Sequence, residues 1–125
     1  MYQALLFDLD DTLYDLRSYW RMRLLRALAT LVPEYPHFDI EALARRALAK
    51  HVYMMHWPDF VRELGVREEL VAHSHAVFCD GWFDEMELYD DSVATLLQLR
   101  SRYRLGLITN GPSDIQHCKI DRFGL

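Results

Sequence analysis

Two short apolar runs, each ended by a cluster of polar residues, constrain most strongly what this chain can fold into. The first run is ALLF (residues 4–7), and the second is LGLI (residues 105–108). Such runs are typical of strands that are buried in a parallel sheet, although periodicity alone does not exclude helix. Open α/β sheets place their sites at the carboxyl ends of parallel strands. We therefore expect the polar residues that follow the two runs to carry the chemistry.

The sequence between the two runs has an almost entirely helical pattern. Apolar residues three or four apart form a stripe over residues 16–31, and strong helix formers predict a second helix over 40–55. Further helices are expected over 66–78 and, capped by Asp91 or Ser92, just before the second run. A helical segment of this length is too long for a simple crossover between strands. We interpret it as a separate, lid-like domain.

Composition narrows the class of protein and its partners. The 125 residues are 51% hydrophobic and 26% charged, which is ordinary for a soluble globular domain. With a net charge of -5, the chain has no excess of basic residues for binding nucleic acid, so nucleic acid is not an expected partner. No apolar run has the length of a membrane span, so no membrane association is expected. Cys79 and Cys118 are too few for a disulfide scaffold and predict a reducing, cytoplasmic location. The oligomeric state is left open.

The first polar cluster is FDLDDTL (residues 7–13). Residues two apart on a strand point to the same face, so Asp8 and Asp10 could share one site. Two neighbouring carboxylates titrate differently, which lets one act as a nucleophile while the other holds a proton for a leaving group. Mg²⁺ would suit these oxygen ligands and offset the repulsion between a carboxylate and a phosphate. The simpler interpretation of the motif is an Asp-rich turn after a strand.

The second polar cluster follows the second run and leads into a helix that begins near Pro112. A helix N-terminus has free N–H groups and a positive dipole end, and these can bind phosphate. Thr109 and Asn110 add side-chain donors, and Gly111 lets the backbone approach a ligand closely. Taken alone, this segment would be an ordinary turn before a helix.

Together the two clusters resemble two motifs of the haloacid dehalogenase-like (HAD) hydrolase superfamily, which is dominated by aspartyl-phosphate phosphatases. FDLDDTL (7–13) matches the first motif and LGLITNG (105–111) the second. The helical stretch between them is similar to the family's inserted cap, and KIDRFGL (119–125) to its continuation after the second motif. The resemblance implies an α/β fold with a Rossmann-like parallel-sheet core, incomplete in this chain, and an all-helical cap insertion.

The resemblance also implies domain boundaries. Residues 1–14 and 90–125 would belong to the core, and residues 15–89 would form the cap. The family's two remaining motifs, a lysine and a late acidic pair, normally lie beyond the point where this sequence ends, and Lys119 matches a non-catalytic position. We therefore expect the chain to be an amino-terminal portion of a longer hydrolase, with little or no turnover on its own.

Roles carry over by position. Asp8 would be the nucleophile and a Mg²⁺ ligand. Asp10 would be the general acid and then base, and would lend its backbone carbonyl to the metal. Thr12 would support the geometry around Asp8. The transferring phosphoryl group would be held by the residues that follow the second run: Thr109, Asn110 and Gly111.

The expected function is Mg²⁺-dependent hydrolysis of small phosphate monoesters through an aspartyl-phosphate, with a small phosphorylated metabolite as substrate. Phosphoglycolate-like, sugar-phosphate and nucleoside-monophosphate substrates all stay open. The alternatives are a dehalogenase-type hydrolase and a non-catalytic truncated fragment of a HAD-like protein. Asp10 favours the phosphatase, because a halide leaving group needs no proton. A phosphoryl-accepting receiver domain is rejected, because the centre of this chain is helical.

Weaker candidates have simpler interpretations. His73, His75 and Cys79 could suggest zinc, but residues two apart on a helix face different ways. Six aromatic or histidine residues could line a substrate pocket but are better explained as cap core: Tyr53, His56, Trp57, Phe60, Trp82 and Phe83. Four arginines could bind a second anionic group but fit a solvated helix face better: Arg17, Arg21, Arg45 and Arg46.

Overall fold

The computed structural model describes residues 3–125, which divide into two compact units. The first joins the N-terminal segment up to Leu16 to Phe83–Leu125 and is called the sheet unit below. The second is Arg17–Trp82 and is called the helical unit. The assignment of residues 15–89 to a cap stays a prediction.

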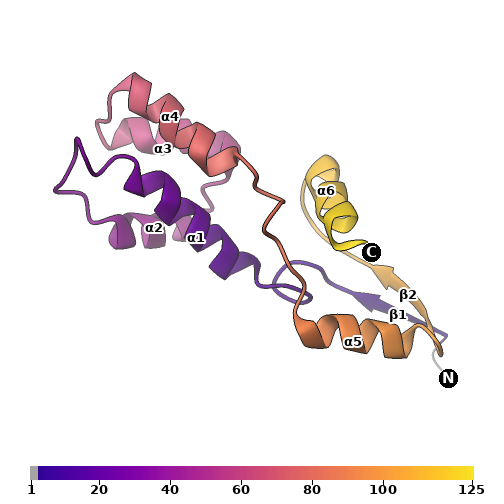
Figure 1. The fold of residues 1–125 in the computed structure, drawn as a ribbon. Helices are drawn as coiled ribbons and strands as arrows, with labels where there is room; N and C mark the ends of the chain where they lie inside the picture. Colours follow the sequence, from indigo (N-terminus) through magenta and orange to yellow (C-terminus); the bar gives the residue numbers. More distant parts are fainter. Residues whose placement is uncertain (1–2) are drawn as a thin grey trace. The chain divides into compact units, whose positions relative to one another are not determined.

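Over its described residues, the sheet unit contains two strands and two helices, and Figure 1 labels them β1, β2, α5 and α6. Strand β1 (Ala4–Phe7) and strand β2 (Arg104–Leu107) are parallel neighbours. Helix α5 (Asp90–Leu99) precedes β2, and helix α6 (Ser113–Phe123) follows it. The predicted parallel strands and the α/β class are confirmed.

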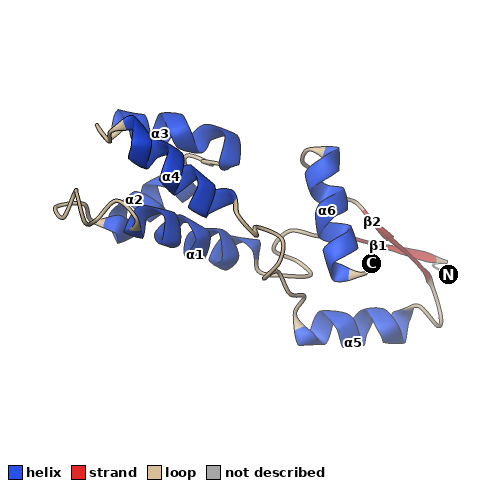
Figure 2. Ribbon diagram, turned by 45° about the horizontal axis from the view of Figure 1, so that its top comes forward, coloured by secondary structure: helices blue, strands red, loops and turns tan. Residues whose placement is uncertain are grey.

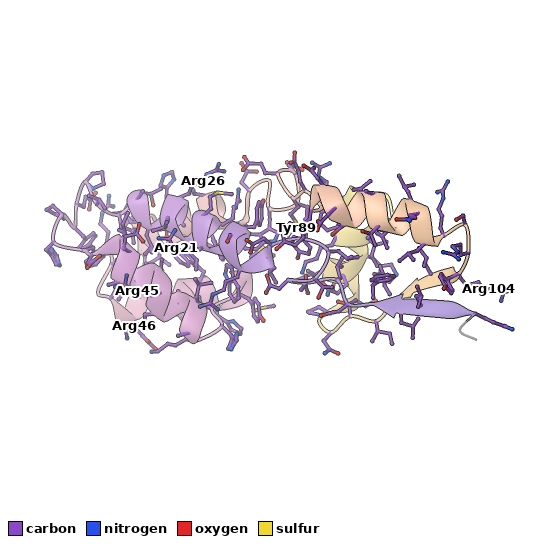
Figure 3. All side chains as sticks on the ribbon, turned by 90° about the horizontal axis from the view of Figure 1, so that it is seen from below. Arg21, Arg26, Arg45, Arg46, Tyr89 and Arg104 are labelled. Atoms are coloured by element: carbon purple, nitrogen blue, oxygen red, sulfur yellow. The ribbon has the colours of Figure 1, made fainter. Side chains whose placement is uncertain are left out.

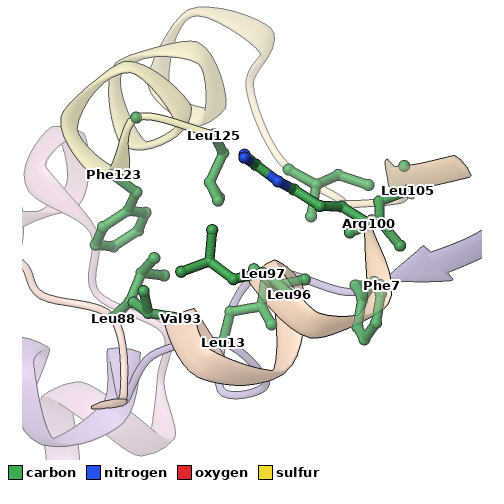
Figure 4. A pocket seen from close by; sticks show the side chains of 13 residues that line it. Phe7, Leu13, Leu88, Val93, Leu96, Leu97, Arg100, Leu105, Phe123 and Leu125 are labelled. Atoms are coloured by element: carbon green, nitrogen blue, oxygen red, sulfur yellow. The ribbon is translucent and has the colours of Figure 1, made fainter. Parts of the chain in front are cut away.

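The register of the two strands separates the faces of the sheet. Phe7 lies opposite Leu107, and both line an apolar groove of about 450 Å³ together with side chains of α5 and α6 (Figure 4). Leu6 is 63% exposed and lies opposite Gly106. A Cβ atom at Gly106 would come within 2.8 Å of Leu6 Cδ2, so a larger residue here would require the exposed Leu6 side chain to move.

The helical unit is built from α-helices and one 3₁₀ turn (Figure 2). The α-helices are α1 (Leu16–Ala29), α2 (Ile40–Ala49), α3 (Trp57–Glu63) and α4 (Glu68–Cys79). The 3₁₀ turn is η1 (Met54–His56). Along residues 3–125, no helix combines the length and the apolar character that crossing a bilayer requires.

The core of the helical unit confirms that the α1 stripe is a buried face. Leu24 and Leu28 of this stripe have no exposed surface. Trp57 and Phe78 stack with ring centroids 5.0 Å apart, which joins α3 to α4. The indole N–H of Trp57 donates to Ser74 Oγ at 3.0 Å, so the one polar atom of this ring is satisfied inside the core.

Two helix boundaries differ from the sequence predictions. Helix α2 ends at Ala49 rather than near residue 55, because His51 takes a left-handed conformation (φ 54°) that reverses the chain before η1. Helix α5 begins at Asp90, one residue earlier than its expected cap. Asp91 and Ser92 therefore lie inside the first turn, and the prediction that one of them caps this helix was wrong. Asp91 still lies near the positive end of the helix dipole.

Candidate active site

The loop after β1 is held by a buried turn. The backbone N–H of Leu13 donates to Leu9 O at 3.0 Å, and both leucine side chains are buried. Asp8 precedes this turn and is exposed, with Oδ1 accepting the N–H of Leu9 at 2.8 Å. The N–H of Ile108 donates to Phe7 O at 2.9 Å, so the two strands end side by side. The loop that carries the first motif thus begins next to the segment that carries the second.

Three side chains donate hydrogen bonds to the carboxylate of Asp10. Lys119 Nζ lies 2.8 Å from Oδ1, and the Tyr14 hydroxyl donates to the same oxygen at 2.5 Å. Gln116 Nε2 donates to Oδ2 at 3.0 Å. Both carboxylate oxygens are therefore engaged, and the orientation of Asp10 is fixed by groups from its own loop and from α6.

These contacts set the charge of Asp10. Burial raises the pKa of its carboxyl, but the hydrogen bonds from Lys119, Tyr14 and Gln116 and the positive charge of Lys119 outweigh it. The pKa of Asp10 is therefore below its ordinary value of 3.8. At neutral pH Asp10 is a carboxylate paired with an ammonium group.

Lys119 was assigned to a non-catalytic position by the sequence resemblance. Its side chain is only 7% exposed and pairs with Asp10, whose side chain is 24% exposed. Lys119 and Gln116 are three residues apart on α6, so they share one face of this helix. A polar pair on a buried helix face just after a polar loop was the available signal, and the sequence interpretation missed it.

The segment after β2 meets the first motif through Gln116. Gln116 Nε2 lies 2.5 Å from Thr109 Oγ1 and 2.8 Å from the backbone oxygen of Asn110. Gly111 has φ 127°, a conformation that side chains rarely adopt, and a Cβ there would lie 3.5 Å from the Gln116 side chain. The glycine thus permits the tight turn that brings Gln116 back over Thr109.

The structure brings some of the predicted site residues together. Asp10, Thr109 and Asn110 all contact one side-chain amide. Asp8 directly follows strand β1 and lies two residues before Asp10. Thr12 is exposed and its N–H donates to Leu9 O. The catalytic, metal-binding and phosphate-binding roles of these residues stay proposals.

The oxygen donors of the first motif fit Mg²⁺ in their chemistry. Within residues 3–125, no three His, Cys, Asp or Glu side chains cluster as a metal site. Mg²⁺ commonly takes one or two carboxylates and keeps several waters. The exposed Asp8 carboxylate could supply one ligand. The side chain of Asp10 is paired with Lys119, so Asp10 would contribute its backbone carbonyl.

The weaker candidates show structural contacts in the helical unit. His75 Nε2 lies 2.9 Å from Met54 O, and this hydrogen bond joins α4 to η1. The contact does not support the hypothesis that His75 binds zinc. Arg21 forms an ion pair with Glu41 in which both side chains are about half exposed. The Arg46 guanidinium lies 5.9 Å from the Phe60 ring centroid. Figure 3 labels Arg21 and Arg26 of α1 and Arg45 and Arg46 of α2.

A comparison with protein-family models identifies the class. The model described as haloacid dehalogenase-like hydrolase matches residues 2–125. The chain belongs to the haloacid dehalogenase-like hydrolase family.

Curated relatives of the chain are phosphatases. The glyceraldehyde 3-phosphate phosphatase of Methanopyrus kandleri is 30% identical over all of this chain and 58% of its own length. The human N-acylneuraminate-9-phosphatase is 28% identical over 95% of this chain and 55% of its own length. The chain therefore spans less than two thirds of the curated relatives that it matches.

Solved structures share the fold. A haloacid dehalogenase-like family hydrolase from Xanthomonas campestris superposes with a TM-score of 0.71 at 21% identity, over 99% of this chain and 57% of that chain. A 2-haloacid dehalogenase from Pseudomonas syringae superposes with a TM-score of 0.55 at 24% identity, over 100% of this chain and 60% of that chain. These similarities confirm the Rossmann-like α/β fold.

Proposed function

We propose that the full-length protein is a Mg²⁺-dependent phosphatase that hydrolyses small phosphate monoesters through an aspartyl-phosphate on Asp8. The observation that carries the proposal is that Asp10 and Thr109 both contact the side-chain amide of Gln116. This contact brings the proposed proton-transfer residue close to a hydroxyl that could donate a hydrogen bond to phosphate. The phosphatase relatives support the same reaction. The unpaired thiols of Cys79 and Cys118 are consistent with a cytoplasmic location.

In the first step, a carboxylate oxygen of Asp8 attacks phosphorus and the bond to the ester oxygen breaks. Asp10 gives its proton to the departing oxygen, which leaves as an alcohol. The negative charge of a bound phosphate ester raises the pKa of a neighbouring carboxyl and so favours the protonated form that this step needs. Bound Mg²⁺ would neutralise part of the phosphate charge. Thr109 and Asn110 would donate to the phosphoryl oxygens, with Gly111 allowing the backbone to approach.

In the second step, water attacks the phosphorus of the aspartyl-phosphate and gives a proton to Asp10. The bond between phosphorus and the Asp8 oxygen breaks, which releases inorganic phosphate and regenerates both carboxyl groups. The ionised form of Asp10 that its three donors stabilise is the form that accepts this proton. A hydrolase that expels a halide has no need of the first proton, so Asp10 favours the phosphatase over the dehalogenase.

The proposed substrate class is a small phosphorylated metabolite. The names of the two relatives describe phosphatases of glyceraldehyde 3-phosphate and of an N-acylneuraminate 9-phosphate. Both names fit a phosphate monoester carried by a small polar molecule. A panel of such esters, tested on the full-length protein, would identify the substrate.

The test is a steady-state assay of the full-length protein with p-nitrophenyl phosphate, with Mg²⁺ and with a chelator. Asp8→Asn is expected to reduce turnover to background, because an amide is a poor nucleophile. Asp11→Asn is the matched control: it also changes an aspartate of this loop to asparagine, and asparagine tolerates the left-handed backbone of residue 11 (φ 57°). Activity that survives Asp8→Asn, or halide release from a 2-haloacid without phosphatase activity, would refute the proposal.

A further inference from the structure

Gln116 occupies the point where the two motif segments meet. It lies on α6, is only 5% exposed, and belongs to neither motif. Its Nε2 atom is within hydrogen-bond distance of three oxygens: Asp10 Oδ2 at 3.0 Å, Thr109 Oγ1 at 2.5 Å and Asn110 O at 2.8 Å. Because Asp10 and Gln116 are far apart in the sequence, this contact exists only in the folded protein.

The chemistry of these neighbours fixes the orientation of the amide. An ionised carboxylate and a backbone carbonyl can only accept hydrogen bonds. The group that faces Asp10 Oδ2 and Asn110 O must therefore be the NH₂ of Gln116 and not its oxygen. The alternative flip of the amide would place an oxygen against two acceptors.

The same neighbours determine where the Thr109 hydroxyl proton goes. The amide nitrogen of Gln116 offers two hydrogens and accepts none, so Thr109 cannot donate to it. The Thr109 oxygen faces this nitrogen, and its proton is therefore directed to another acceptor. An anion bound at the end of β2 would be such an acceptor.

We propose that Gln116 is a positioning residue of this site: its amide aligns the Asp10 carboxylate with Thr109 and turns the Thr109 hydroxyl proton toward the phosphoryl group. The inference rests on the proposed phosphatase function and adds a residue that neither motif contains. Gln116 would have two separable effects. Its contact with Thr109 would act on phosphate affinity, and its contact with Asp10 would act on kcat.

The experiment uses the full-length protein with Mg²⁺ and inorganic phosphate as the probe, measured by calorimetry, together with kcat for p-nitrophenyl phosphate. Gln116→Met keeps the length of the side chain but cannot donate. We expect it to weaken phosphate binding about 10-fold and to lower kcat about 10- to 100-fold, as for lost hydrogen bonds to charged groups. Cys118→Ser, at an exposed position of the same helix, is the control and should match the wild type.

A double-mutant cycle identifies the route of the effect on affinity. Thr109→Val removes the hydroxyl and keeps the shape of the side chain. If Gln116 acts on phosphate through this hydroxyl, Gln116→Met should weaken phosphate binding no further when Thr109 is already valine. In that background Gln116→Met should still lower kcat, because the contact with Asp10 is also lost.

Gln116→Leu provides the second variant should Gln116→Met fail to fold. Its apolar side chain adds no charge beside Asp10 and cannot donate, so phosphate binding should again weaken about 10-fold. Wild-type phosphate affinity in the folded variants, or full additivity with Thr109→Val, would refute the role of Gln116. A wild-type protein that shows no turnover and binds no phosphate would instead refute the proposed function.

Discussion

The helical unit and the sheet unit differ in how much of their apolar surface they bury. The helical unit closes an apolar core in which Leu24, Leu28 and Val61 have no exposed surface. The sheet unit also buries apolar side chains, but it leaves Leu97 54% and Ile108 60% exposed, and it buries polar groups of its candidate site as well. The apolar groove along α5 and α6 is part of this open surface (Figure 4).

The difference indicates which interactions stabilise each unit. Apolar burial stabilises the helical unit at each core position, and substitutions there should act on folding. In the sheet unit, Asp10, Gln116 and Lys119 lose water contacts that their mutual hydrogen bonds replace. Substitutions in this network should therefore act on chemistry as well as on stability.

Asp10→Asn should separate chemistry from folding in the sheet unit. Asparagine keeps the shape of aspartate but neither supplies nor accepts the proton, so kcat for p-nitrophenyl phosphate should fall about 10²- to 10⁴-fold. Circular dichroism should show an unchanged fold. Turnover near the wild-type rate would contradict the role of Asp10 as acid and base.

A pair of leucines compares the two units directly. Leu28→Ala removes a fully buried side chain from the helical unit and should lower the free energy of unfolding by about 3–5 kcal/mol. Leu97→Ala, in an exposed position of α5, should change it by no more than about 0.5 kcal/mol. Denaturant unfolding of both variants measures the difference. Equal losses would show that the two units do not differ in this way.

Lys119→Met tests the buried ion pair of the sheet unit. Loss of the ammonium leaves the Asp10 carboxylate partly buried without its cationic partner, which should cost about 3 kcal/mol of stability. The double variant Lys119→Met with Asp10→Asn should recover much of this loss, because no charge is then left unpaired. A double variant that is less stable than Lys119→Met alone would argue against the pairing.

The pH dependence of stability should be the smallest effect. The folded-state pKa of Asp10 is lower than its ordinary value of 3.8, so the unfolded chain binds this proton more readily. The contribution of Asp10 is therefore fully present above pH 3.8 and is lost as the pH falls through the folded-state pKa. The stability difference between wild type and Asp10→Asn should narrow below pH 3.8. If the stability difference widened on acidification, the pKa of Asp10 in the folded protein would be raised and not lowered, which would contradict the prediction.

Much of the fold could be predicted from local patterns. The runs at 4–7 and 105–108 predicted the two strands, and the spacing of Leu24 and Leu28 predicted the buried face of α1. The end of α2 was missed, because the strong helix formers up to Leu48 give no sign that the chain turns at the left-handed residue His51. Local propensity does not report where tertiary contacts end a helix.

The candidate site could be predicted only in part, for a related reason. Asp10 and Thr109 follow strands and belong to recognisable motifs. Gln116, Lys119 and Tyr14 belong to neither motif and are recognised by their hydrogen bonds to Asp10 in the folded chain. The spacing of Gln116 and Lys119 marks a polar face of α6, but it does not indicate that this face meets Asp10, so the structure was needed to find the contact.

The most direct test of the account is to trap the proposed intermediate. The full-length protein would be mixed with Mg²⁺ and a phosphate monoester, quenched in acid during turnover, and digested for mass spectrometry. The account predicts a phosphoryl group on the side chain of Asp8. With p-nitrophenyl phosphate, whose leaving group departs without a proton from Asp10, the amount should be larger for Asp10→Asn, because the second step is slowed more than the first. Turnover with the phosphoryl group on another residue, or with none on Asp8 in either protein, would contradict it.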